Sequence, residues 1–191
     1  MGEPVKMRAS SIGFVVALAV FGLDQLVKWI VTGPLGVDHD GAIFYILPFF
    51  QFSYTQNVGI SLGQLQATTE IGRWMLVLLT SAIAVGVAFW ITREKNRIDQ
   101  IALGMVLGGA LGNILDRVRH GYVVDFADLN FHGAPRFFCL SYENGLCRPF
   151  LIFNVGDAAI SIAVVILLLR AFLSRKDQTK GSGPEETIEH A

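Results

Sequence analysis

Four apolar stretches, each long enough to cross a lipid bilayer, constrain this chain more than any other feature of its sequence. A membrane-spanning helix needs about 20 predominantly apolar residues. The chain has four such stretches, at about Ser11 to Val31, Ile71 to Ile91, Ile98 to Leu115 and Phe153 to Leu173. Its 191 residues are 52% hydrophobic and 16% charged, whereas soluble domains carry about 25% charged residues. The sequence therefore predicts an all-α membrane protein with a four-helix bundle.

Basic residues are distributed unevenly around these stretches. Lys6 and Arg8 precede the first, three basic residues occupy the turn at 93–97, and others follow the fourth at 175–180, whereas residues 32–72 include no Lys or Arg. Because Lys and Arg accumulate in cytoplasmic loops, we expect both chain ends and the 93–97 turn in the cytoplasm. The two long connections then lie outside it. The net charge of −1 says nothing about a nucleic-acid or acidic partner, and we expect no nucleic-acid partner.

The two ends of the chain need separate interpretation. A basic start before an apolar stretch is also typical of a cleaved signal peptide, but here the apolar stretch continues through Trp29 and Val31 without a small-residue cleavage site. We therefore expect a retained helix. Residues 1–176 would form one integral membrane domain. Residues 177–191 are poor in apolar side chains and are predicted to be a disordered cytoplasmic tail.

The first long connection does not have a helical pattern. Glycine and proline residues interrupt it, and between them Ala42–Leu47 and Phe49–Tyr54 are rich in β-branched and aromatic residues. This pattern predicts short strands in a small sheet at the membrane surface; a loop with aromatic anchors and no sheet remains the alternative. In the third stretch, Gly104 and Gly108 would let another helix approach closely, which indicates packing within the bundle rather than dimerisation.

Several carboxylates occupy positions that a membrane chain tolerates poorly. An ionisable group at membrane depth costs about 2.5 kcal/mol or more, so each is a candidate functional residue. When the four stretches are threaded through a bilayer, four of the five carboxylates come near the same membrane face, and Asp128 is placed more loosely. The five are Asp24, Asp116, Asp125, Asp128 and Asp157.

Two of these carboxylates have polar neighbours within the apolar stretches. Asp24 and Lys28 are four residues apart and share a helix face. We expect them to anchor or orient the helix, with the Lys28 ammonium extending outward to the membrane surface. Asn113 and Asp116 share a face at the end of the third stretch, and Arg117 follows. A helix-terminal cap with an ion pair is the expected role of Asp116 and Arg117.

Asp125 and Asp157 are the carboxylates that we expect to be catalytic. Asp125 is bracketed by apolar residues just beyond the third stretch, and Asp157 lies near the start of the fourth helix. A helix N-terminus favours an ionised carboxylate, whereas apolar walls and a neighbouring anion favour a protonated one. Two carboxylates that share one proton can activate water and protonate a scissile carbonyl, as an aspartyl protease requires.

The sequence lacks the residues that other catalytic mechanisms require. The four histidines are scattered through loops and tail, and the sequence has neither an H-E-x-x-H string nor a glycine-rich phosphate loop after a strand. We therefore expect no metal and no cofactor. A proton-coupled transporter also places carboxylates in its spans and remains the alternative class. Four spans without a repeat, with acids crowded at one edge, favour the hydrolase.

Two cysteines, Cys139 and Cys147, lie in the second long connection. Outside the cytoplasm they can oxidise to a disulfide. A disulfide and a pair of free thiols are equally open from the sequence.

The residues described above carry a resemblance to a known family. The chain resembles the lipoprotein signal peptidases, also called signal peptidase II, of bacterial inner membranes. The resemblance covers about Ile12 to Phe172. It implies a multi-pass inner-membrane protein with a four-helix bundle, an extracytoplasmic β-cradle and a short outer helix. Five strings occur in the family's order: Asp24–Lys28, Asn57–Gly59, Gly108–Arg117, Val123–Phe126 and Phe153–Asp157.

The resemblance also implies an activity. Such an enzyme is an aspartyl endopeptidase that needs no cofactor and works in contact with membrane lipid. It cleaves prolipoproteins on the N-terminal side of a cysteine that carries diacylglycerol, and globomycin blocks it. By motif position Asp125 and Asp157 are the catalytic pair, and a monomer suffices because all site residues lie in one chain. The positions that match lining or supporting residues are Asn57, Asn113, Arg117, Asn154, Asp24, Lys28 and Asp116.

The chain departs from the family pattern at three places. Gly156 stands where the family usually has alanine. After Gly59, Ile60 and Leu62 replace the usual alanine and phenylalanine, which puts the shape of the substrate groove in doubt. The connection between the two catalytic positions is longer by roughly residues 138–149. This extension affects the geometry of the outer helix rather than the chemistry.

Overall fold

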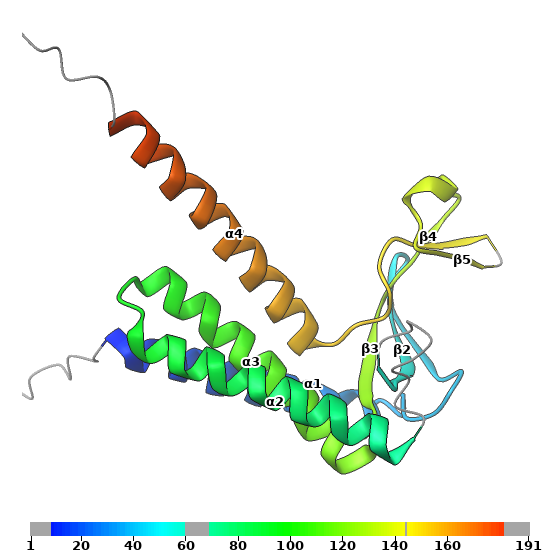
Figure 1. Cartoon of the computed structure of the whole chain (residues 1–191). Helices are drawn as coiled ribbons and strands as arrows, with labels where there is room; N and C mark the ends of the chain where they lie inside the picture. The colour runs from blue at the N-terminus through cyan, green and yellow to red at the C-terminus, as the bar shows by residue number, and fades with distance from the viewer. Residues whose placement is uncertain (1–8, 60–68, 144, 182–191) are drawn as a thin grey trace, which may run out of the picture.

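Four long helices form the body of the molecule, and two small antiparallel sheets stand at one end of it (Figure 1). The computed structural model describes residues 9–59, 69–143 and 145–181. All four helices are long and apolar enough to cross a membrane, so the predicted four-helix membrane fold is confirmed. We call the end that carries the sheets the sheet side. The helices are α1 (Ala9–Thr32), α2 (Glu70–Arg93), α3 (Arg97–His120) and α4 (Val155–Gly181).

Two helices extend beyond their predicted ends. α3 continues to His120 and is capped by Gly121, whose φ of 88° suits glycine and whose N–H donates to the Arg117 carbonyl. The prediction that Asp116 and Arg117 form the helix terminus is therefore wrong, since both lie inside the helix. α4 continues to Gly181, the first glycine or proline after Gly156, and so extends into the segment predicted to be disordered. Residues 182–191 lie outside the described residues.

The bundle is organised around α3, which packs against each of the other three helices. A Cβ placed at Gly104 or Gly108 would collide with the backbone of α1, and one placed at Gly109 would collide with the Gly156 carbonyl of α4. The prediction that the small residues of this helix serve tight packing within the bundle is confirmed. At the opposite end of the bundle from the sheets, Arg170 of α4 pairs with Asp99 of α3 at 2.6 Å.

The first sheet lies against the sheet-side ends of the helices. It consists of β1 (Ile43–Leu47), β2 (Phe50–Asn57) and β3 (Val123–Leu129) in the order β1-β2-β3. The two strands predicted in the first connection are confirmed, and the alternative of a loop without a sheet is wrong. β3 was not predicted. Six of its seven residues are buried, and an apolar cluster that includes Val31, Tyr54 and Phe126 joins it to the end of α1.

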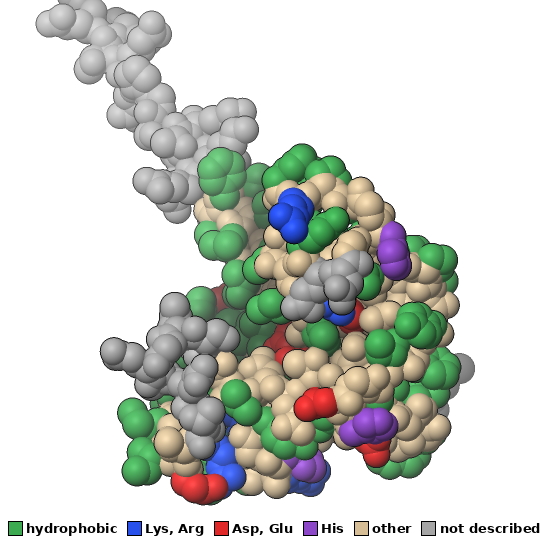
Figure 2. Space-filling model, turned by 90° about the vertical axis from the view of Figure 1, so that its right-hand side faces the viewer, with side chains coloured by type: hydrophobic (Ala, Val, Ile, Leu, Met, Phe, Trp, Pro, Cys, Tyr) green, Lys and Arg blue, Asp and Glu red, His purple; other side chains and the backbone are tan. Residues whose placement is uncertain are grey.

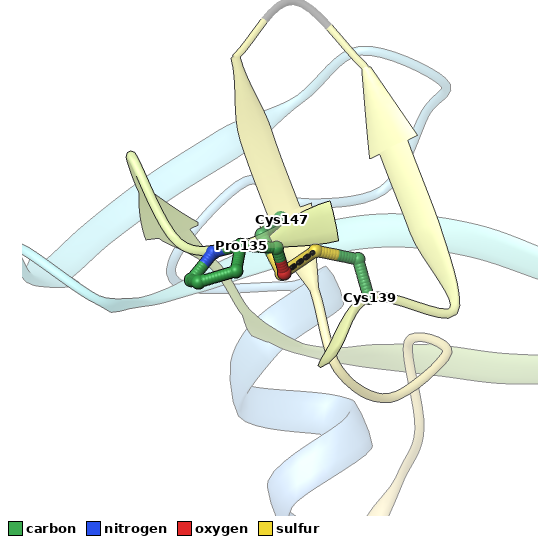
Figure 3. Close-up of a disulfide and its surroundings, with 3 residues drawn as sticks. All are labelled: Pro135, Cys139 and Cys147. Atoms are coloured by element: carbon green, nitrogen blue, oxygen red, sulfur yellow. Dashed lines mark hydrogen bonds between the residues drawn. A yellow bond between two sulfur atoms is a disulfide. The ribbon is translucent and has the colours of Figure 1, made fainter. Parts of the chain in front are cut away.

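The second sheet is formed by the extension of the second connection. Its strands are β4 (Phe131–His132), β5 (Ser141–Glu143) and β6 (Leu146–Arg148), in the order β4-β6-β5. The 3₁₀ turn η1 (Arg136–Phe138) is the one helical turn in the described part of the connections. A disulfide joins Cys139 to Cys147, and the Cys139 sulfur lies 3.3 Å from the Pro135 carbonyl oxygen (Figure 3). We call residues 131–143 and 145–151 the disulfide lobe.

Candidate active site

Asp125 projects from β3 into a buried position between two asparagine side chains. The Asn57 amide nitrogen donates to one carboxylate oxygen at 2.9 Å, and that of Asn154 donates to the other at 2.7 Å. The Asn57 oxygen accepts the Gly59 N–H at 3.0 Å, so its NH₂ group must face Asp125. Asp125 is only 2% exposed. Both oxygens of this carboxylate are therefore held in fixed directions away from bulk water.

Asp157 lies in the first turn of α4 and takes part in its N-terminal cap. The Asp157 N–H donates to the Asn154 side-chain oxygen at 2.9 Å, while the Asn154 N–H donates to an Asp157 oxygen at 3.3 Å. This reciprocal arrangement is a capping box. The Asn113 amide of α3 donates to the other Asp157 oxygen at 2.8 Å. The cap that starts the helix thus also orients the second carboxylate.

Asn154 and the backbone beside it bring the two carboxylates together. Its amide nitrogen donates both to Asp125 and, at 3.1 Å, to the Asn113 oxygen, and Asn113 in turn contacts Asp157. The preceding residue, Phe153, exchanges backbone hydrogen bonds of 2.8 and 3.2 Å with Ala127 of β3. Because this bridge aligns β3 with the start of α4, two carboxylates 32 positions apart in the sequence share one hydrogen-bond network.

The environment of Asp125 favours its protonated form. Burial, followed by repulsion from Asp157, raises the pKa of the Asp125 carboxyl to about 7, against the opposing effects of the hydrogen bonds from Asn57 and Asn154 and the charge of Lys28. Near neutral pH the pair therefore holds a proton that an isolated aspartate has lost. The two carboxylates interact closely enough that this proton belongs to the pair.

Lys28 joins two further carboxylates behind this pair. Its ammonium lies 2.7 Å from Asp24 and 2.7 Å from Asp116, and it donates to the Asn113 oxygen at 3.4 Å. Lys28 is 5% exposed, so the prediction that its ammonium extends to the membrane surface is wrong. A counter-charge on a different helix, Asp116 of α3, holds it inside the bundle. This ion triad fixes α1 to α3 directly beneath the carboxylate pair.

The triad also holds the backbone on either side of the pair. The Gly156 N–H donates to Asp24 at 2.9 Å, and the Val124 N–H donates to Asp116 at 3.2 Å. Gly156 precedes Asp157, and Val124 precedes Asp125. Each triad carboxylate therefore positions the residue next to one member of the pair.

Gln25 belongs to this network and was not singled out from the sequence. Its amide donates to Asp116 at 3.1 Å and to Asp24 at 3.3 Å. The clue was its place beside Asp24 in a membrane-spanning stretch, where a polar amide needs partners.

Arg117 lies beside the pair with unused hydrogen-bonding capacity. Its guanidinium donates to the Asn113 carbonyl at 3.4 Å and lies within electrostatic range of Asp157, Asp125 and Asp116. Its buried Nε has no hydrogen-bond partner among the described residues. All nine site residues predicted from the sequence thus lie in or beside one network. Their catalytic and binding roles stay predictions.

Asp128 does not join this network. It is three positions beyond Asp125 on β3, and residues separated by an odd number point to opposite faces of a strand. Arg148 of the disulfide lobe contacts both of its oxygens, at 2.9 and 3.2 Å, and the Gln51 amide donates to it at 2.8 Å. Four of the five carboxylates thus lie together, as expected, whereas Asp128, which was placed more loosely, does not join them. Asp128 instead fastens the lobe to the strand that carries Asp125.

A cavity of about 300 Å³ lies next to Asp157. Figure 2 shows hydrophobic side chains around a hollow in this end of the molecule, with carboxylate atoms visible inside it. Within the described ranges, no group of three or more His, Cys, Asp and Glu side chains is placed to hold a metal ion. The residues that line the cavity are Leu129, Phe150, Leu151, Phe153, Asp157, Ala158, Ser161 and Ile162.

Fold and site together define an integral membrane protein with a hydrogen-bonded pair of carboxylates, one buried and one half-buried, at one end of a four-helix bundle. Residues 16–173 match the family model described as signal peptidase (SPase) II. The chain is 48% identical over 161 residues to a lipoprotein signal peptidase of Sphingopyxis alaskensis, covering 84% of this chain and 85% of the relative. It is 44% identical over 178 residues to one of Rhizorhabdus wittichii, with 93% of each chain covered. The chain belongs to the signal peptidase II family.

Solved structures agree with the fold. A bacterial membrane enzyme determined by the in meso method at 1.9 Å resolution superposes with a TM-score of 0.67 at 26% identity, covering 84% of this chain and 92% of that one. A second, determined at 2.3 Å resolution, superposes with a TM-score of 0.68 at 24% identity, covering 93% and 94%. The helical bundle with its sheets is therefore an established membrane-enzyme fold. Ile60 and Leu62, two of the departures from the family pattern, lie outside the described residues.

Proposed function

We propose that this protein is an aspartyl endopeptidase that removes the signal peptide from diacylglyceryl-modified prolipoproteins, cutting on the N-terminal side of the lipidated cysteine. Family membership supports the substrate class. The observation that carries the mechanism is the pair formed by the buried Asp125 and the half-buried Asp157, which Asn154 and Asn113 connect by hydrogen bonds.

The two carboxylates divide the proton transfers. Asp125, whose pKa is raised to about 7, carries the shared proton and donates it to the scissile carbonyl oxygen. Asp157 lies at the N-terminus of α4, where the helix dipole favours negative charge, and takes a proton from the attacking water. Water oxygen and carbonyl carbon form a bond, which gives a neutral tetrahedral diol.

Collapse of the diol restores the pair. The proton on Asp157 passes to the departing amine as the carbon–nitrogen bond breaks, and one diol hydroxyl returns its proton to Asp125. No cofactor takes part in either step. The Nε of Arg117, which has no partner in the part of the chain that the structure describes, is available to a substrate carbonyl, and the Asn57 amide orients Asp125 during both transfers.

The location of the pair suits a substrate that is anchored in lipid. α4 enters the bundle at Asp157, so the carboxylates lie at the sheet-side boundary of the spans rather than at their midplane. A lipid-modified cysteine can remain in the bilayer while the neighbouring peptide bond reaches the pair. We infer that the sheet side faces away from the cytoplasm of the bacterial inner membrane, with both chain ends inside, as the distribution of basic residues indicates.

Purified protein in lipid nanodiscs, supplied with one prolipoprotein in lipidated and unlipidated forms, tests the proposal. We expect cleavage of the lipidated form alone, a new N-terminus at the lipidated cysteine by mass spectrometry, inhibition by globomycin and no effect of metal chelators. Cleavage at another bond, or equal turnover of the unlipidated precursor, would contradict the proposed specificity.

A further inference from the structure

The disulfide lobe exposes a group of large apolar side chains. Phe137 is 81% exposed, Leu140 69%, Leu151 68% and Phe138 63%. The Phe137 and Phe138 rings lie 4.2 Å apart, so they present one shared apolar surface instead of pointing in opposite directions. Contiguous exposed apolar surface of this kind marks a contact with a membrane or another protein.

The lobe cannot fold inward to bury these side chains. The disulfide closes the segment that carries Leu140, and Phe138 directly precedes its first cysteine; the other cysteine, Cys147, is 1% exposed. Arg148 at the end of β6 is fastened to Asp128, which is completely buried in the first sheet. The apolar group is therefore held outward by the rest of the fold.

The position of the lobe indicates what covers this surface. β6 leads through Phe150 and Leu151 directly into α4, whose membrane-spanning segment starts at Val155. In Figure 1 the lobe stands beside the sheet-side end of α4 and projects sideways from the axis of that helix. The exposed apolar side chains of Phe150 and Leu151, at 59% and 68%, thus connect the lobe to the start of the span.

The charge of the lobe fits the same location. Arg136 borders the aromatic pair, and its guanidinium lies 4.8 Å from the centre of the Tyr142 ring. Aromatic side chains are enriched at the boundary between lipid tails and head groups. An arginine beside them can meet head-group phosphates while its stem rests on apolar surface.

We propose that the disulfide lobe is a membrane-interface anchor, which rests Phe137, Phe138 and Leu140 in the lipid leaflet on the sheet side of the bundle. The lobe then forms a rigid support beside the start of α4. This inference does not depend on the proposed enzymatic activity.

Photo-crosslinking of the full chain in phosphatidylcholine–phosphatidylglycerol nanodiscs tests the anchor. The photoreactive analogue p-benzoylphenylalanine replaces Phe137. Because this side chain is exposed, we expect the replacement not to disturb the fold. The matched controls are position 168 in α4, where Leu168 is 64% exposed on the span, and position 39, where the polar His39 side chain is 73% exposed in the α1–β1 connection. The intact disulfide and an unchanged elution volume confirm that each variant is folded.

We expect phospholipid adducts at position 137 with a yield within about threefold of position 168 and at least about tenfold above position 39, because interfacial aromatics contact lipid directly. A yield at position 137 as low as that at position 39 would overturn the anchor. So would a dominant protein–protein adduct, since it would assign the surface to a second copy of the chain.

Discussion

Replacing Lys28 with methionine removes the cation that lies 2.7 Å from both Asp24 and Asp116. Methionine keeps most of the side-chain volume, so the change tests charge rather than packing. Removing one partner of a buried ion pair typically costs about 3–5 kcal/mol, because the other charge stays buried without compensation. Here two carboxylates lose their shared counter-charge, and we expect the free energy of unfolding to fall by at least about 3 kcal/mol.

Unfolding in mixed detergent micelles, with a rising fraction of dodecyl sulfate and helix content followed by circular dichroism, measures this loss. Glu70→Gln is the matched control, because it breaks an ion pair with Arg73 whose acid is 75% exposed. Exposed pairs contribute about 0–1 kcal/mol. If Lys28→Met costs no more than Glu70→Gln, the triad does not stabilise the bundle and its assigned role as a support is wrong.

The remaining predictions concern the site and the packing around it. The rate of cleavage should fall as pH rises through about 7, because Asp125 then loses the shared proton, and a pH–rate profile checks this. Protonation of Asp125 in the folded protein contributes stability that is lost as pH rises from about 4 through about 7. The parent should therefore lose stability relative to Asp125→Asn over this pH range in the same micelle assay, because asparagine has no proton to lose. Replacing both Cys139 and Cys147 with serine removes the disulfide, whose cysteines are eight positions apart. The free energy of unfolding should then fall by about 2.5 kcal/mol, while cleavage persists at low temperature. Gly109→Ala should destabilise the protein more than Gly156→Ala. The Cβ at position 109 would collide with the Gly156 carbonyl oxygen, whereas a Cβ at position 156 lies 3.0 Å from the Gly109 carbonyl oxygen.

The last comparison also accounts for one departure from the family pattern. Glycine at 156, where the family usually has alanine, accompanies a close approach of α4 to the Gly109 backbone. A Cβ at this position would also lie 3.1 Å from the Asn154 side-chain oxygen that caps α4. The smaller residue therefore relieves crowding at the start of the helix that carries Asp157.

The parts of the fold that were predictable from sequence are those with a local cause. Long apolar stretches specify membrane helices because a span must satisfy its backbone internally, and the β1–β2 hairpin follows from its aromatic and β-branched residues. β3 escaped prediction because Asp125 and Asp128 interrupt its apolar pattern, and burial on both faces hides the alternation that usually marks a strand.

The parts of the site that were missed depend on distant partners. Lys28 was expected at the membrane surface because its burial requires Asp116, and the local sequence does not show that α3 places this carboxylate 2.7 Å away. The separate role of Asp128 was missed for the same reason, because its partner Arg148 lies in the disulfide lobe and not in the neighbouring sequence. The disulfide stayed open because a separation of eight residues permits the bond without requiring it; the antiparallel pairing of β5 and β6 brings the two cysteines together.

Single-turnover cleavage of a diacylglyceryl-modified prolipoprotein by the parent protein, Asp125→Asn and Asp157→Asn tests the central claim most directly. An amide cannot transfer the proton, so we expect each variant to keep its fold and its binding of globomycin-like ligands while the rate of bond cleavage falls at least about 10³-fold. Because the pair acts as a unit, the double variant should lose little more than either single variant. A single variant that cleaves at a near-parental rate would contradict the shared-proton mechanism.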